Sequence, residues 1–134
     1  MSQLYASLFY QPDVTAIFSD RALLGYMIQV EAALAKAQAQ INIIPRAAAT
    51  IIEQIGQNAL AEIDFDGLAV ATGFAGNIAI PFVKQFTAIV QQQNEEASRY
   101  VHWGATSQDI IDTAMILQCR DALGLIEQQL QSAY

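Results

Sequence analysis

Apolar side chains recur along most of this chain at intervals of three and four residues, which places them on one face of a helix. The first such pattern lies in residues 19–42, where Ser19 or Asp20 is placed to cap the first amides. Residues 1–18 lack the pattern and are predicted to be irregular, with a turn at Pro12. The apolar face expected of the first helix consists of Leu23, Met27, Val30, Leu34, Ala37 and Ile41.

Three further helices are predicted in the middle of the chain. Pro45 suits the first turn of the first of them. Asp64 or Asp66 is placed to cap the next helix and Gly76 to end it, while Pro81 is expected to open the last. The inward side chains expected on the first and last of these helices are Ala48, Ile51, Ile52, Ile55, Phe82, Phe86, Ile89 and Val90. No segment alternates apolar and polar residues as a strand does, so the fold is predicted to be all-α.

Residues 107–134 are predicted to form one long helix. At a rise of about 1.5 Å per residue, such a helix is longer than a small domain is wide. No glycine or proline stop signal stands at its end. We therefore expect residues 1–106 to form an N-terminal helical domain and residues 107–134 to begin a longer bundle helix that the sequence interrupts. The apolar face expected of this helix consists of Ile111, Met115, Cys119, Ala122, Ile126, Leu130 and Ala133, and is widened by Ile110, Ala114, Leu117 and Leu125.

Composition limits the classes of partner. The 134 residues are 54% apolar and 14% charged, with 13 acidic and 6 basic side chains and a net charge of −7. So few charges predict that protein covers part of the surface, either a partner subunit or the remainder of a longer chain. The lack of a Lys or Arg cluster argues against nucleic-acid binding. The glycines and proline inside the uncharged run Gly67–Val83 argue against a membrane span. Cys119 is expected to be a small buried hydrophobe, and an N-terminus without a basic start favours a cytoplasmic protein.

The segment YVHWGATSQDIIDTA, residues 100–114, concentrates the polar chemistry of the chain. It holds the only histidine, His102, and the only tryptophan, and two adjacent hydroxyls, Thr106 and Ser107, stand before the last helix. Thr106 with Asp109 three residues on fits a capping box. A helix N-terminus with spare hydroxyls also suits a carboxylate or phosphate. Local chemistry alone leaves both interpretations open.

Three other kinds of site find no support in the sequence: a serine triad, a zinc site and a phosphate-binding loop. A serine triad needs members that converge from separate elements, whereas Ser107, His102 and Asp109 share one turn. A single histidine and a single cysteine supply too few ligands for a zinc site. The segment GFAGN lacks the spacing and the preceding strand of a phosphate loop. No metal and no cofactor are therefore predicted.

Two segments resemble a known superfamily. HWGATSQDIIDTA resembles the first signature region of the fumarase/aspartase superfamily, and FSDRALLGYMIQVEAALAKAQAQINIIP is similar to its 3-carboxy-cis,cis-muconate cycloisomerase branch. The resemblance extends over essentially the whole chain, as the N-terminal portion of a protein some three times longer. Adenylosuccinate lyases carry an Arg-His-Asp segment where this chain has Gly76 and Asn77, which disfavours that branch.

The resemblance implies a fold, a reaction and a set of contacts. The fold is the N-terminal helical domain of the superfamily, leading into the first long helix of a central bundle in a homotetramer. The reaction is the cofactor-independent conversion of 3-carboxy-cis,cis-muconate, a small polycarboxylate, to 4-carboxymuconolactone in the β-ketoadipate pathway of aromatic catabolism. Thr106 and Ser107 would hold a substrate carboxylate, His102 would donate a hydrogen bond or hold the turn, and Gln108 and Asn77 would add polar contacts.

The same resemblance places the catalytic acid and base residues beyond residue 134. No catalytic residue is therefore expected here beyond a supporting role for His102, and the 134-residue chain alone is predicted to be inactive. Two alternatives remain: a sibling lyase with a related dicarboxylate substrate, and a helical interaction module whose last helix pairs with a partner.

Overall fold

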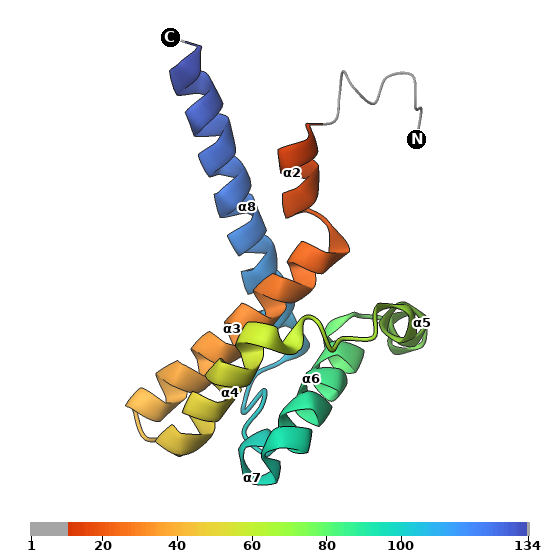
Figure 1. Ribbon diagram of the computed structural model, residues 1–134, viewed down its shortest axis with the longest axis vertical. Coiled ribbons are helices and arrows are strands. Elements are labelled where there is room, and N and C mark those ends of the chain that lie inside the picture. Colours follow the sequence, from red (N-terminus) through yellow and green to blue (C-terminus); the bar gives the residue numbers. More distant parts are fainter. Residues whose placement is uncertain (1–10, 134) are drawn as a thin grey trace.

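The computed structural model describes residues 11–133, in which every regular element is a helix (Figure 1). The helices are α2 (Pro12–Ile17), α3 (Asp20–Gln40), α4 (Arg46–Ala59), α5 (Phe65–Ala75), α6 (Ala79–Gln93), α7 (Glu95–Ser98) and α8 (Ser107–Ser132). Over this part of the chain the all-α prediction is confirmed. The expectation of irregular structure before residue 19 is wrong for Pro12–Ile17, because the fixed φ of proline suits the first turn of a helix. For residues 1–10 that expectation lies outside the described residues.

The helix boundaries follow from local side-chain chemistry. The Ser19 hydroxyl accepts a hydrogen bond from the amide of Ala22 at 3.2 Å, and the Asp64 carboxylate accepts one from Gly67 at 3.0 Å. These residues, and not Asp20 or Asp66, are therefore the N-caps. Gly76 ends α5 in the left-handed region, with φ of 77°, which glycine adopts without strain.

Two prolines stand one to two residues from their predicted places. Pro45 is the N-cap of α4 and lies just outside its first turn. Pro81 lies inside the first turn of α6, which begins two residues earlier at Ala79. The first four amides of a helix have no intrahelical partner, so a proline without an amide hydrogen interrupts nothing there.

α3 is the central helix of the molecule. It forms a hairpin with α4 and also packs against α8, while α6 contacts α4, α7 and α8 (Figure 1). The rings of Phe82 and Phe86 stack in the core with their centroids 6.0 Å apart. The largest fully buried side chains are Phe82, Phe86, Leu24, Met27, Ile52, Ile110, Glu31 and Val90. One member of this set, Glu31, is a carboxylate.

The buried face of α3 differs from the predicted one by about one residue. Ala37 and Ile41, predicted to face inward, are exposed, and Leu23, Val30 and Leu34 are only half-buried. The face turns because α3 packs against α4 and α8 together, and its alanines allow both helices to approach. The residues of α3 that are buried are Leu24, Met27, Ile28, Glu31, Ala35 and Ala39.

α8 extends past the other helices toward the C-terminus (Figure 1). Its buried side chains are Ile110, Ala114, Gln118 and Ala122. The predicted apolar face is confirmed at Ile110, Ala114 and Ala122 and is wrong at Met115, Ile126 and Leu130, which are 46–58% exposed. Gln118 contacts the N-terminal part of the molecule by donating a hydrogen bond to the carbonyl of Ile17 at 2.7 Å. Among residues 11–133, no helix has both the length and the apolar character that a membrane crossing requires.

Candidate functional site

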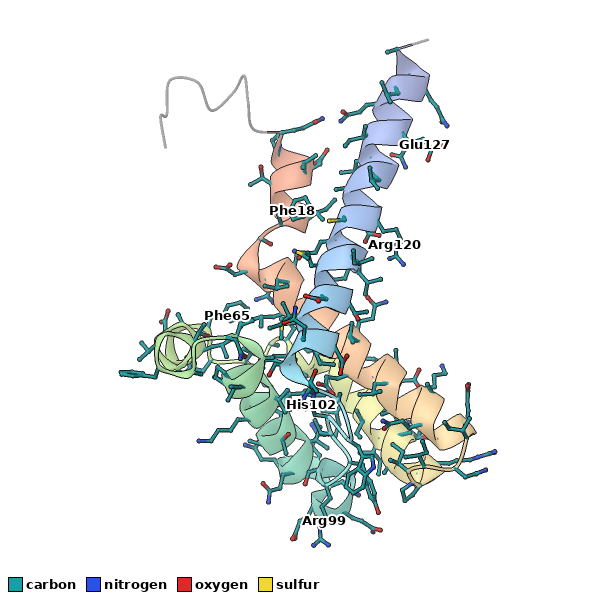
Figure 2. All side chains as sticks on the ribbon, turned by 180° about the vertical axis from the view of Figure 1, so that it is seen from behind. Phe18, Phe65, Arg99, His102, Arg120 and Glu127 are labelled. Atoms are coloured by element: carbon teal, nitrogen blue, oxygen red, sulfur yellow. The ribbon has the colours of Figure 1, made fainter. Side chains whose placement is uncertain are left out.

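The polar turn predicted from the sequence connects α7 to α8. Two residues in it adopt left-handed backbone conformations, His102 with φ of 58° and Gly104 with φ of 70°. Glycine tolerates this region freely, whereas a histidine there is uncommon. His102 lies near the start of α8, close to the point where α8 meets the body of the molecule (Figure 2). Some contact must therefore hold residue 102 in this conformation.

That contact is a carboxylate on α3. The Glu31 side chain is only 1% exposed, and both of its oxygens bind His102. Oε2 accepts a hydrogen bond from the backbone amide of His102 at 3.1 Å, and Oε1 lies 2.6 Å from its ring nitrogen Nδ1. Burial raises the pKa of the Glu31 carboxyl, and the hydrogen bonds from His102 oppose that shift without cancelling it.

A second side chain of α3 holds the same turn. Gln38 donates from Nε2 to the backbone carbonyl of Trp103 at 2.6 Å, two helical turns along α3 from Glu31. The Trp103 ring is 48% exposed and lies against Tyr100, with ring centroids 5.6 Å apart. The turn is thus fastened to α3 at two adjacent residues, and the tryptophan ring packs on its outer side.

Thr106 and Asp109 form the predicted capping box at the start of α8. Asp109 Oδ2 accepts hydrogen bonds from the Thr106 amide at 2.8 Å and from its hydroxyl at 3.0 Å. These two bonds lower the pKa of the Asp109 carboxyl. The capping interpretation is therefore confirmed, and in this arrangement the Thr106 hydroxyl proton is already donated to Asp109.

The other three predicted site residues differ in what they contact. Ser107 is the first residue of α8, and its half-buried hydroxyl has no hydrogen bond within residues 11–133. Gln108 is exposed and donates to Asp112 one turn along the same helix. Asn77 lies between α5 and α6, where its carbonyl oxygen accepts from the amide of Ile80 at 3.2 Å. Only His102, Thr106 and Ser107 belong to one turn, and Gln108 and Asn77 are engaged in local helix contacts.

Sequence reasoning missed Glu31 entirely. It is the only acidic residue between Asp20 and Glu53, in a helix otherwise made largely of alanine and aliphatic residues. A lone carboxylate at a helix position flanked by core residues is a signal, because burial is costly unless the charge is paired. The partner lies 71 residues away in sequence, and no spacing rule joins the two.

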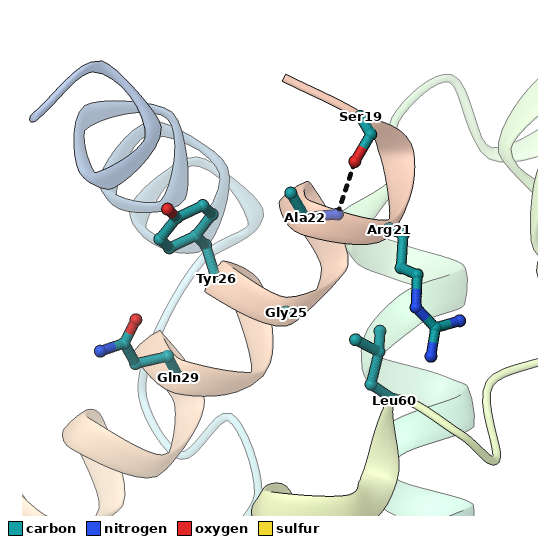
Figure 3. A pocket seen from close by; sticks show the side chains of 7 residues that line it. All are labelled: Ser19, Arg21, Ala22, Gly25, Tyr26, Gln29 and Leu60. Atoms are coloured by element: carbon teal, nitrogen blue, oxygen red, sulfur yellow. Dashed lines mark hydrogen bonds between the residues drawn. The ribbon is translucent and has the colours of Figure 1, made fainter. Parts of the chain in front are cut away.

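Two cavities of about 410 Å³ each lie along α3. The first is open, and Tyr26 and Arg21 form part of its wall (Figure 3). The Tyr26 hydroxyl donates a hydrogen bond to Asp121 of α8, which holds that wall in place. The second cavity lies between α3 and α4, beside the ion pair of Lys36 and Glu53 at 3.1 Å. Neither cavity is lined by the polar turn.

Comparisons with known proteins place the chain among lyases. A family model described as lyase matches residues 10–133. The chain is 68% identical, over all of its 134 residues and 30% of the relative, to the 3-carboxy-cis,cis-muconate cycloisomerase of Acinetobacter baylyi. It is 45% identical to the enzyme of the same name from Pseudomonas putida, over 96% of this chain and 30% of that protein. The chain thus spans about 30% of the length of these curated relatives.

Solved structures agree with the sequence comparison. The crystal structure of β-carboxy-cis,cis-muconate cycloisomerase from Acinetobacter calcoaceticus sp. ADP1 matches with a TM-score of 0.93 and 67% identity, over 96% of this chain and 30% of that one. A fumarate lyase from Mesorhizobium sp. BNC1 matches with a TM-score of 0.77 and 37% identity, over 90% of this chain and 27% of that one. The helical arrangement is therefore common to proteins with more than one named activity.

Proposed function

Because this chain belongs to the lyase family, we propose that it is the N-terminal portion of a cofactor-independent cycloisomerase that converts 3-carboxy-cis,cis-muconate to 4-carboxymuconolactone. One observation carries the proposal. The match to the Acinetobacter cycloisomerase extends over the whole chain at high identity, and so includes both the polar turn and the α3 segment that fastens it. The chain would contribute one part of an active site whose acid and base residues lie elsewhere in the protein.

The proposed reaction is a balanced isomerisation. One substrate carboxylate oxygen forms a bond to an alkene carbon, the π bond breaks, and the neighbouring carbon takes up a proton. No electron is gained or lost. The protein must therefore deliver a proton and stabilise the negative charge on the remaining carboxylates. A cofactor has no part in these steps.

The turn offers donors for one substrate carboxylate. The Ser107 hydroxyl and the unpaired amides at the start of α8 are the first candidates, because a helix N-terminus carries about half a positive charge. Thr106 joins them when its hydroxyl turns from Asp109 to the substrate, and His102 Nε2 can donate only in the state in which it carries a proton. The family resemblance implies further polar contacts from Gln108 and Asn77 to the substrate. To make such a contact, each side chain would have to break its local hydrogen bond, to Asp112 and to the Ile80 amide respectively.

Charge indicates that the rest of the site comes from elsewhere. The substrate carries three carboxylates, whereas the chain has a net charge of −7. Arg99 is the one basic residue in the turn, and its Nη2 lies 3.6 Å from Oε1 of Glu95, with which it forms an ion pair. We therefore propose that positive groups are supplied by other parts of the protein and by other copies of it in a homo-oligomer, for which a tetramer is the expected state. The apolar side chains exposed along α8 support that association.

The test removes the two hydroxyls from the full-length product of the gene. Lactonisation is followed by the loss of ultraviolet absorbance as the conjugated diene is consumed. Each hydrogen bond to a charged group contributes about 1.5–3 kcal/mol, so Thr106→Ala with Ser107→Ala should lower kcat/KM by roughly 100-fold or more.

Thr113→Ala is the matched control. It removes an exposed hydroxyl from the same helix, where that group donates to the carbonyl of Asp109, and it should leave kcat/KM near the original value. An unchanged kcat/KM in the double variant would contradict the assigned site. Absence of any lactonisation by the unmodified product would contradict the proposed function itself.

A further inference from the structure

We propose that Glu31 is a positioning residue that acts through His102, holding the tautomer with its proton on Nδ1 and leaving Nε2 free for the substrate. The inference rests on the proposed function for the reaction that His102 serves. The arrangement of Glu31 and His102 stands on its own geometry.

Burial of an ionised carboxylate at the position of Glu31 has a cost in free energy. Its neighbours on the buried face of α3 are apolar, and an ionised carboxylate removed from water is destabilising by several kcal/mol unless it is paired. Both donors that pair it come from residue 102, one from the backbone and one from the ring. A carboxylate buried only to fasten a turn needs no ring donor, because backbone amides suffice. The contact to Nδ1 therefore requires a reason of its own.

The contact with Glu31 affects both the protonation and the orientation of the His102 imidazole. While Glu31 is ionised its carboxylate only accepts hydrogen bonds, so in that state Nδ1, at 2.6 Å from Glu31 Oε1, carries a proton. The bond to the backbone amide also helps hold residue 102 at its φ of 58°, which fixes where the ring starts from the chain. The orientation and the tautomer of a functional histidine are commonly set by such a partner on its other nitrogen.

The second ring nitrogen of His102, Nε2, remains available for another contact. The His102 side chain is 19% exposed, and within residues 11–133 no group forms a hydrogen bond to Nε2. The nitrogen is thus accessible, on a ring whose other nitrogen is held by Glu31. With Nδ1 bonded to Glu31, Nε2 is the ring nitrogen of His102 that remains for a contact with the substrate.

A neutral isostere separates this role from simple packing. In Glu31→Gln, the single carbonyl oxygen cannot accept from both donors. The backbone amide of His102 has no alternative to donating, so the Gln oxygen should take that bond and its NH₂ should face Nδ1. Nδ1 must then become an acceptor, and the proton moves to Nε2. The variant keeps the shape of the pair and reverses the tautomer.

The experiment reads the tautomer by long-range proton–nitrogen correlation NMR at a pH where the imidazole is neutral. The His102 signals are identified by their loss in His102→Gln. The protein should show the proton on Nδ1, and Glu31→Gln should show it on Nε2. Glu62→Gln, an exposed matched change, should show no difference. A proton on Nε2 in the unmodified protein would overturn the inference.

Activity gives the second readout. In the full-length product, Glu31→Gln should lower kcat by roughly 10- to 100-fold, the range seen when the outer partner of a functional histidine is removed, while Glu62→Gln leaves it unchanged. A reversed tautomer with unchanged kcat would overturn the positioning role. The tautomer is measured without substrate, so a wrong tautomer would contradict this inference and leave the proposed function untouched. Failure of the proposed function would appear instead as no lactonisation by the unmodified product.

Discussion

Glu31 shows how a single residue couples the fold to the candidate site. Its carboxylate replaces an apolar side chain in the core and binds a histidine at the start of α8. The same two hydrogen bonds stabilise an uncommon backbone conformation and orient a ring. A buried ion pair contributes little to stability compared with an apolar pair of the same volume. The charge at this position is therefore better explained by its contacts with His102 than by the stability of the core.

Asp109 carries a prediction about acid. Hydrogen bonds from Thr106 lower the pKa of this carboxyl in the folded protein, whereas its value in the unfolded chain is about 3.9. A lowered folded pKa stabilises the fold above the unfolded pKa, and that contribution is lost as pH falls through the folded one. We expect the free energy of unfolding to decline below about pH 4, less steeply in Asp109→Asn, as measured by urea denaturation.

Asp66→Asn is the control for this measurement. Asp66 is also exposed and stands in the first turn of a helix, but it is not the N-cap, and it should leave the acid decline unchanged. Glu31 acts with the opposite sign, because its raised pKa favours the folded state at low pH and that contribution is lost as pH rises. Equal acid declines in the protein and in Asp109→Asn would contradict the capping argument.

At the scale of elements, α8 changes character along its length. Its first half buries Ile110, Ala114 and Gln118 against the body of the molecule, and its second half leaves Leu123 and Leu130 64% and 58% exposed. Large apolar side chains in a row on a protruding helix mark a surface for another protein. The element therefore joins two roles: it starts at the polar turn and ends in a surface suited to a bundle.

This surface predicts self-association through α8. Replacing Leu123 and Leu130 by glutamine removes apolar area worth about 1.5–3 kcal/mol per buried side chain. Sedimentation should show association of the Leu123→Gln, Leu130→Gln protein weakened by at least about tenfold. Ile41→Gln is the matched control, since Ile41 is 68% exposed at the end of α3, and it should associate as the unmodified protein does. Unchanged association of the double variant would exclude α8 as the interface.

At the scale of the whole molecule, the candidate site is poor in positive charge. The polar turn lies outside the two cavities along α3, and the chain has 13 acidic against 6 basic residues. A substrate with three carboxylates needs a site that excludes water and supplies positive potential. Under the proposed function, the described part of the chain would supply one face of such a site.

The 134-residue chain on its own should therefore show no lactonising activity. In the proposed function its turn holds one carboxylate, but the sequence has no cationic cluster for the others, and the proposed acid and base lie elsewhere. The measurement compares the purified chain with the full-length product of the gene, using diene absorbance and equal molar amounts. Turnover by the chain alone would show that the catalytic groups are within residues 1–134.

Local chemistry let the sequence determine the helices and the capping box. Ser19, Asp64 and Thr106 cap helices through partners three residues away, and periods of three and four residues identify the helices themselves. The resemblance to the fumarase/aspartase superfamily rested on the same contiguous segments. Such features are readable because their causes lie within one turn of the chain.

Only the tertiary structure decided which faces are buried and what holds the turn. Helix periodicity places the face of α3 to within about one residue, and the packing of α4 and α8 together selects Glu31 for burial over its neighbours. The bond from Glu31 to His102 spans 71 residues of sequence, and its existence depends on where two helices meet. A pattern of single residues cannot encode that meeting, because it arises from the summed packing of elements that are distant in the chain.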